Sequence, residues 1–256
     1  MEKKTGLTAV RILVVITFLL MVATNAAANI LPINGKNTGQ ISDAYQNLFA
    51  PAGITFAIWG VIYLLLALYT FYQIFFYKNS DKIVKTGVLF SISSIANTAW
   101  IFAWHYEIIP LTMILIVVVL VCLILINQDL HEESFIVRVP FSVYFGWATV
   151  ATIANATVLL VSLGWNGFGV TEDKWAIAII VVGMIIGTVT MLMNKDIAYG
   201  LVLIWAYLGI FIKHTSESGF NGEYTSVIGT VVGCIVIFVA SVLYVVVTLV
   251  KLKKKS

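Results

Sequence analysis

The stretch Pro51–Leu65, PAGITFAIWGVIYLL, opens with a turn-forming Pro and Gly and continues as an apolar run. Phe56, Trp59 and Tyr63 follow one another at positions i, i+3 and i+7, which share one side of a helix. A helix that only contacts lipid needs no aromatic residues, because Leu and Val are apolar enough. The aromatic face therefore indicates a membrane-interface anchor, a packing seam or the wall of a site for a flat ligand.

The composition of the chain places this stretch in a membrane protein. Of 256 residues, 61% are hydrophobic and 11% are charged, whereas soluble domains contain about 25% charged residues. A helical span needs about 20 mostly apolar residues. Eight segments qualify, near residues 9–31, 54–77, 84–106, 108–127, 139–163, 174–193, 197–213 and 226–250. Because these are continuous apolar runs and not short alternating segments, the sequence predicts an all-α integral membrane protein with eight transmembrane helices.

The distribution of Lys and Arg predicts the orientation. With the N-terminus inside, 12 of the 15 basic residues, Lys78 and Lys255 among them, fall on inner segments. Both termini of this multi-pass cell-membrane protein are therefore expected in the cytoplasm. The basic start and first apolar run also resemble a secretory signal. Arg11 adjoins a run that reaches Leu31, long enough to span, so a retained helix is expected.

Several other function classes lack support in the sequence. The net charge of +3 comes largely from the C-terminal KLKKKS, which is typical of a membrane anchor and not of a nucleic-acid site. Cys122 and Cys234 lie inside predicted spans and are expected to be small buried hydrophobes. His105 and His214 fall at predicted outer helix ends, where exposure to water is favoured over haem ligation. Without a nucleophile motif, phosphate loop or paired carboxylates, we expect no enzyme, no metal site and no required cofactor.

The chain divides by composition near residue 165. Residues 1–165 are predicted to form one helical bundle, and residues 166–256 a three-helix transmembrane extension. The extension carries small residues four apart, Gly183 with Gly187 and Gly229 with Gly233, which let helix backbones approach closely. Packing within the bundle is favoured, and a homodimer through either pair is the alternative. The long outer loop after the first span is rich in Gly, Asn and Pro and is predicted to cover the outer mouth of the bundle.

Two further stripes combine amides with aromatic side chains. One runs along the span at 84–106, where Ser93, Asn97, Trp100 and Trp104 share a helix face. The other runs along the span at 139–163 and contains Tyr144, Trp147, Ala151 and Asn155. An amide in lipid is costly unless it is hydrogen-bonded, so both Asn side chains are expected to face the bundle interior. Two Asn that cross-link helices would explain them equally well.

These residues gather in the outer half of the predicted bundle, beneath the long loop. An interfacial belt would place Trp side chains near both membrane surfaces and without amide partners. Trp165 and Trp175 fit such a belt. The rest of the set is typical of a pocket for a planar apolar ligand with a few polar edges. The predicted ligand-binding residues are Phe56, Trp59, Tyr63, Asn97, Trp100, Trp104, Trp147 and Asn155.

Residues 1–163 resemble the TspO/MBR family of tryptophan-rich sensory and translocator proteins. The similarity lies in PAGITFAIWGVIY at 51–63, NTAWIFAW at 97–104 and WATVATIAN at 147–155, in the order and spacing of the family's second, third and fifth helices. The family's loop Trp is missing here, and Pro140 lies further from Trp147 than its counterpart does. Residues 164–256 have no counterpart in the five-helix family, so the chain looks like an extended relative with three additional C-terminal helices.

The resemblance implies a five-helix core that binds porphyrins and other planar hydrophobic ligands, with Trp59, Asn97, Trp100 and Asn155 at or near the pocket. The leading expectation is a membrane binding protein or sensor for such a ligand, for example a tetrapyrrole. The expected partners of the protein are this ligand and the lipid bilayer, with the homodimer as the alternative named above. The alternative is a facilitative transporter of an uncharged or amphipathic small molecule. No Asp, Glu, Lys or Arg lies in the middle of a predicted span, so ion coupling has no candidate.

Overall fold

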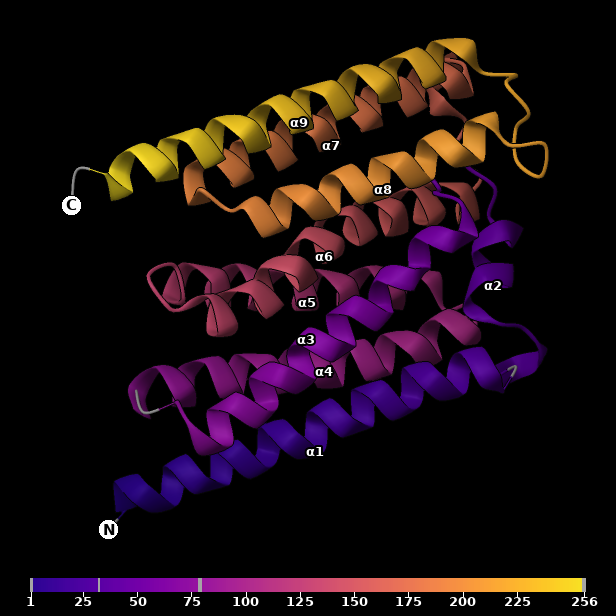
Figure 1. The fold of residues 1–256 in the computed structure, drawn as a ribbon. Coiled ribbons are helices and arrows are strands. Elements are labelled where there is room, and N and C mark those ends of the chain that lie inside the picture. Colours follow the sequence, from indigo (N-terminus) through magenta and orange to yellow (C-terminus); the bar gives the residue numbers. More distant parts are fainter. Residues whose placement is uncertain (1, 32, 78–79, 255–256) are drawn as a thin grey trace. The chain divides into compact units, whose positions relative to one another are not determined.

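The computed structural model describes residues 2–31, 33–77 and 80–254 (Figure 1). Its long helices are α1 (Glu2–Ile30), α3 (Ile58–Phe75), α4 (Ser80–His105), α5 (Ile109–Asp129), α6 (Phe135–Ser162), α7 (Glu172–Asn194), α8 (Ile197–Thr215) and α9 (Thr225–Lys253). Short α2 (Thr38–Ala44) and the 3-10 turns η1 (Ile33–Gly35), η2 (Gly53–Ala57) and η3 (Gly167–Gly169) lie in the connections. Lys78 and Lys255, counted above as inner residues, lie outside the described residues.

The prediction of eight membrane-spanning helices is confirmed. In the described part of the chain, eight helices are long and apolar enough to cross a bilayer. Their outward faces carry many large apolar side chains: along α1, Val14 and Met21 are fully buried, whereas Ile16 and Leu19 are each 58% exposed. Exposed apolar side chains are what contact with lipid requires, so the chain is an all-α multi-pass membrane protein.

The structure forms two compact units. Unit 1 contains α1 to α5 except for the loop segment Tyr45–Ala57, together with α6 as far as Ala148. Unit 2 contains Tyr45–Ala57, the rest of α6 from Thr149, and α7 to α9. The long outer loop is thus shared between the units, and the division falls within α6. The predicted domain boundary at residue 165 stays a prediction.

In unit 1, α4 packs against both α1 and α5 (Figure 1). An edge-to-face aromatic core joins three helices, because the Tyr69 ring lies 4.7 Å from Phe141 and 6.2 Å from Phe90. At one end, Lys82 pairs with Glu133 at 3.0 Å and Lys85 with Asp129 at 2.8 Å. These pairs bring the acidic segment after α5 to the basic start of α4, as expected if both lie on the same side of the membrane.

In unit 2, α9 packs along α7 and α8 (Figure 1). A Cβ on Gly187 would lie 2.5 Å from Leu203 Cδ1, and one on Gly183 would lie 2.7 Å from Tyr207 Oη, so both glycines allow α8 to approach α7 within one chain. Gly229 and Gly233 are exposed, with nothing within 4 Å of a Cβ among the described residues. The homodimer alternative therefore rests on this second pair and stays a prediction.

Candidate functional site

Four ring side chains of unit 1, Trp59, Tyr63, Tyr144 and Trp147, form an aromatic cluster between α3 and α6. Trp59 stacks on Tyr63 with 5.4 Å between ring centroids and meets Tyr144 edge-on at 5.8 Å and Trp147 at 6.3 Å. Tyr144 and Trp147 are buried, whereas Trp59 and Tyr63 are half-buried. The α6 side of the cluster is therefore buried, and its α3 side is partly accessible.

A pair of buried amides lies in the same unit. Asn25 of α1 donates through Nδ2 to Asn97 Oδ1 of α4 at 2.8 Å and also to the Met21 carbonyl at 2.9 Å. Asn25 is 5% exposed and Asn97 is 1% exposed, so the bond is shielded from water. The expectation that Asn97 faces the bundle interior is confirmed, and its partner comes from the first helix.

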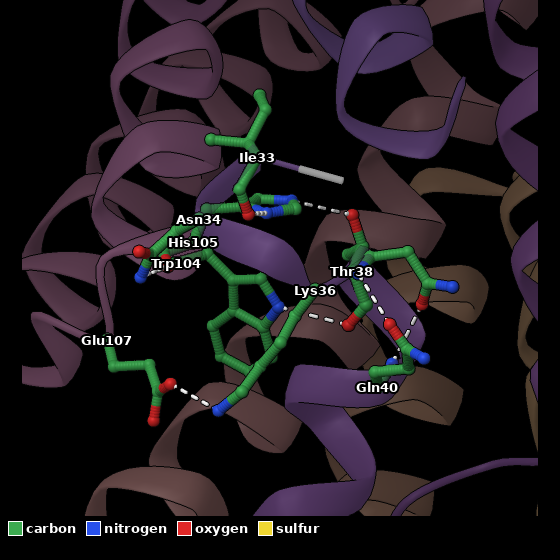
Figure 2. Close-up of polar contacts among 9 residues, drawn as sticks. Ile33, Asn34, Lys36, Thr38, Gln40, Trp104, His105 and Glu107 are labelled. Carbon is green, nitrogen blue, oxygen red and sulfur yellow. Dashed lines mark hydrogen bonds and ion pairs between the residues drawn. The ribbon is translucent and has the colours of Figure 1, made fainter. Parts of the chain in front are cut away.

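The first half of the long loop is fastened to the C-terminal end of α4 (Figure 2). His105 is fully buried, and its Nδ1 lies 3.0 Å from the Ile33 carbonyl while Nε2 lies 3.2 Å from Thr38 Oγ1. The Trp104 indole N–H donates to the Thr38 carbonyl at 3.2 Å. Around them, Asn34 Nδ2 donates to the His105 carbonyl at 2.9 Å. We call this set, residues 33–38 with Trp104 and His105, the loop clamp.

Two further contacts hold the clamp in place. Lys36 pairs with Glu107 at 2.6 Å, just beyond the end of α4. Asn37 Oδ1 accepts from the Gln40 N–H at 2.9 Å while Gln40 Oε1 accepts from the Asn37 N–H at 2.8 Å, a reciprocal cap that starts α2. Trp100 stacks on Trp104 at 5.1 Å, so both tryptophans of the predicted stripe on α4 lie at the clamp. Hydrogen bonds and an ion pair therefore hold the first half of the loop against the end of α4.

The prediction that the two outer histidines are exposed to water is wrong. His105 and His214 are both fully buried, and His214 Nε2 lies 2.9 Å from the Leu48 carbonyl. Each histidine ties a piece of the long loop to a helix end, over 72 and 166 positions of sequence, respectively. Both ring nitrogens of His105 have protein partners, which leaves this side chain poorly suited to ligate haem iron.

Two predicted ligand contacts lie in unit 2. Phe56 lies in the 3-10 turn η2, which runs directly into α3 at Ile58, so the prediction that Phe56 shares one side of a helix with Trp59 and Tyr63 stays a prediction. Asn155 is 4% exposed and donates to the Ala151 carbonyl of its own helix at 2.8 Å. The membership of Phe56 and Asn155 in one pocket with the residues of unit 1 stays a prediction.

Sequence reasoning missed one feature of unit 2. A cavity of about 450 Å³ lies beside Trp165 and Trp175, which the sequence suggested only as interface anchors. The tight turn between them, Asn-Gly-Phe-Gly at 166–169, was the available signal. Its Gly167, Phe168 and Gly169 all have positive φ, between 53° and 78°, which reverses the chain and brings the two indoles together.

The comparison with known families supports one identification. The family model described as TSPO-like protein matches residues 11–246. The match includes α7, α8 and most of α9, the helices that the sequence suggested as an extension of a five-helix core. No curated protein and no solved structure matches the chain. Because the family match covers nearly all of the described helices, this multi-pass membrane protein belongs to the TSPO-like family.

Proposed function

We propose that this protein binds a hydrophobic planar ligand, such as a tetrapyrrole, against the aromatic cluster of unit 1. The observation that carries the proposal is the half-buried Trp59–Tyr63 stack, backed by Tyr144 and Trp147. Flat conjugated ligands gain most from indole and phenol faces of this kind. The ordered loop clamp of the same unit is a suitable cover for such a site.

One hydroxyl of the cluster supplies a polar contact for the ligand's edge. The Tyr63 hydroxyl oxygen is buried and has no hydrogen-bond partner among the described residues, whereas the Tyr144 hydroxyl lies by the Asn97 amide. A buried hydroxyl without a partner costs about 1–3 kcal/mol. A ligand carrying a carboxylate or a ring nitrogen would satisfy such a hydroxyl. The site therefore favours a planar molecule with a polar rim over a purely hydrocarbon one.

Fluorescence titration of the purified protein tests this proposal. Protoporphyrin IX and haem are added to the full chain in detergent, and quenching of Trp emission is followed to saturation. Trp59→Leu removes one half-buried ring of the stack, and we expect the Kd to rise about tenfold, equivalent to about 1.4 kcal/mol. Tyr63→Phe keeps the ring and removes only the unpartnered hydroxyl, so it separates stacking from hydrogen bonding.

Tyr72→Phe is the matched control, because Tyr72 lies on the same helix and stacks on Phe76 at 5.8 Å, away from the cluster. Its affinity should equal that of the wild type. Binding that is absent, non-saturable or unchanged in Trp59→Leu would count against the proposed site. A thermal melt of each variant separates lost affinity from lost fold.

A second observation in unit 1 favours facilitative transport as the alternative function. Gln73 is fully buried, and neither its Nε2 nor its Oε1 has a hydrogen-bond partner in the described part of the chain. More hydroxyls in the same condition lie along α3 and α4, on Tyr69, Thr70, Thr86, Ser91 and Ser94. From Tyr63 to Gln73, the α3 members extend over about 15 Å of helix. Unpaired polar atoms inside a span are costly and are typical of solute pathways.

Liposome swelling distinguishes the two functions. Proteoliposomes are mixed with glycerol or urea, and the rate of volume recovery is compared with that of protein-free vesicles. Transport predicts a faster recovery that Gln73→Leu abolishes and Tyr72→Phe preserves. Recovery at the protein-free rate, together with saturable porphyrin binding, would leave ligand binding as the function.

A further inference from the structure

The cavity of unit 2 is formed by three pieces of chain and has the size of a small-molecule site. Its lining comes from the loop at Gln46–Phe49, the last turns of α6, and the turn that leads into α7 together with the first turns of α7. Its volume of about 450 Å³ falls within the range of about 300–1,000 Å³ that is usual for ligand pockets. It is separate in sequence from the aromatic cluster of unit 1 and is not used in the proposed function.

Two indoles form the aromatic wall of this cavity. Trp165 and Trp175 lie 4.7 Å apart at an interplanar angle of 62°. Trp175 is fixed because its Nε1–H donates to the Gly167 carbonyl at 2.7 Å, and a Cβ on Gly167 would come within 2.9 Å of the same nitrogen. The Asn166 side chain accepts from the Phe168 N–H at 3.1 Å and holds the turn. The wall is therefore preformed by the η3 turn.

Another part of the cavity lining, at Asn47, is also held by ordered contacts. Asn47 is 8% exposed, and its Oδ1 accepts from the N–H groups of Phe49 at 3.1 Å and Ala50 at 2.9 Å. The Thr157 hydroxyl donates to the same oxygen at 3.3 Å, which ties the loop to α6. Asn47 Nδ2 donates to the Tyr45 carbonyl at 3.0 Å. The polar groups of Asn47 are thus engaged in holding the wall.

The charge at the cavity is negative. Glu172, in the first turn of α7, lines the cavity and is exposed, and none of the described lining residues is Lys, Arg or His. Partial burial, together with the nearby carboxylates of Glu223, Glu172 and Asp173, raises the pKa of the neighbouring Tyr224 phenol. Lys174 is exposed but does not line the cavity. The N-terminus of α7 would attract an anion, but acidic side chains already occupy its first turn.

We propose that this cavity is a second binding site and takes an organic cation, an ammonium group carried on a small hydrophobic body. Indole faces attract cations most strongly of all aromatic side chains, and a neighbouring carboxylate adds direct charge attraction. Trp165, Trp175 and Glu172 supply these two interactions. Leu160, Val161 and Ile179 line the same cavity and accept the apolar body. The ammonium can come from a free amphipathic amine or from the choline headgroup of a lipid.

Calorimetric titration of the full chain in a maltoside detergent tests the charge requirement. The probe is phenyltrimethylammonium, and its uncharged carbon isostere, tert-butylbenzene, is the comparison. We expect saturable binding of the cation that is at least about tenfold tighter than that of the isostere. Equal binding of the two compounds, or no saturable binding of the cation, overturns the proposal.

Matched variants assign the binding to this cavity. Glu172→Gln keeps the shape and removes the charge, so it should weaken cation binding about tenfold. Glu223→Gln removes a neighbouring carboxylate that does not line the cavity. This variant should change the Kd of the cation by less than about threefold. Trp165→Leu should abolish the preference for the cation. Cation binding that is unchanged in Glu172→Gln, or equally weakened in both Glu variants, contradicts the assignment.

Competition identifies the source of the ammonium group. Diheptanoyl phosphatidylcholine that displaces the probe, while diheptanoyl phosphatidylglycerol does not, assigns the site to a lipid headgroup. Displacement by neither lipid assigns it to a free amine. Porphyrin affinity should be unchanged in Glu172→Gln, so failure of this proposal and failure of the proposed function can be distinguished.

Discussion

At the scale of single residues, the Asn25–Asn97 hydrogen bond offers a direct test of how unit 1 is held together. Removing either amide leaves the other buried without that partner, so Asn97→Ala should lower the free energy of unfolding by about 1–2 kcal/mol. Interhelical polar pairs in membrane proteins couple by about 0.6 kcal/mol on average and about 1.7 kcal/mol at most. A double-mutant cycle with Asn25→Ala, followed by unfolding in mixed detergent, should give a coupling energy in this range.

Asn29→Ala is the control for this cycle, because Asn29 Nδ2 donates within α1, to the Asn25 carbonyl at 2.9 Å. It should be close to additive with Asn97→Ala. Full additivity of Asn25→Ala and Asn97→Ala would show that the interhelical hydrogen bond contributes nothing net to stability.

The sequence could suggest that Asn97 faces inward, because amides avoid lipid. It could not single out Asn25 as the partner, since the bond spans 72 positions and depends on how α1 packs against α4.

At the scale of elements, the contact between η2 and α8 is a close approach that Gly209 permits. The Ala52 N–H donates to the Gly209 carbonyl at 2.9 Å, and a Cβ on Gly209 would overlap the Thr55 side chain. Gly209→Ala should therefore lower the free energy of unfolding by about 1–3 kcal/mol. Gly229→Ala is the matched control in α9, where an added Cβ would have no neighbour within 4 Å among the described residues. A helix-interior Gly replaced by Ala should be neutral or stabilising by up to about 1 kcal/mol.

Thermal unfolding of both variants by circular dichroism measures this difference, and equal melting temperatures of the two variants would mean that the packing of η2 against α8 is loose.

The same contact shows where sequence reasoning reaches its limit. Runs of about 20 apolar residues identify the spans without knowledge of their neighbours. The start of α3 at Ile58, the buried His105 and the cavity at Trp165 depend on side chains that meet only after the helices have packed.

At the scale of the whole molecule, the eight candidate spans of the described residues predict that both ends of the chain lie on one side of the membrane. The eight helices and the TSPO-like family match establish a multi-pass membrane protein, and the distribution of Lys and Arg predicts that both ends are cytoplasmic. The ion pairs of Lys82 and Lys85 are consistent with the assigned loops, because they join segments that the topology puts on one side. On this topology, the loop clamp and the cavity of unit 2 both face the exterior.

Cysteine labelling in intact cells tests that orientation. Cys122 and Cys234 are buried, so Cys122→Ser/Cys234→Ser is a mild background that should not react with a membrane-impermeant maleimide. Ser218, between α8 and α9, and Glu132, between α5 and α6, are both exposed. Ser218→Cys should be labelled in intact cells, and Glu132→Cys only after lysis. The reverse labelling pattern would show that the protein has the opposite orientation in the membrane. The aromatic cluster would then lie nearer the cytoplasm, and its ligand would have to be supplied from inside the cell.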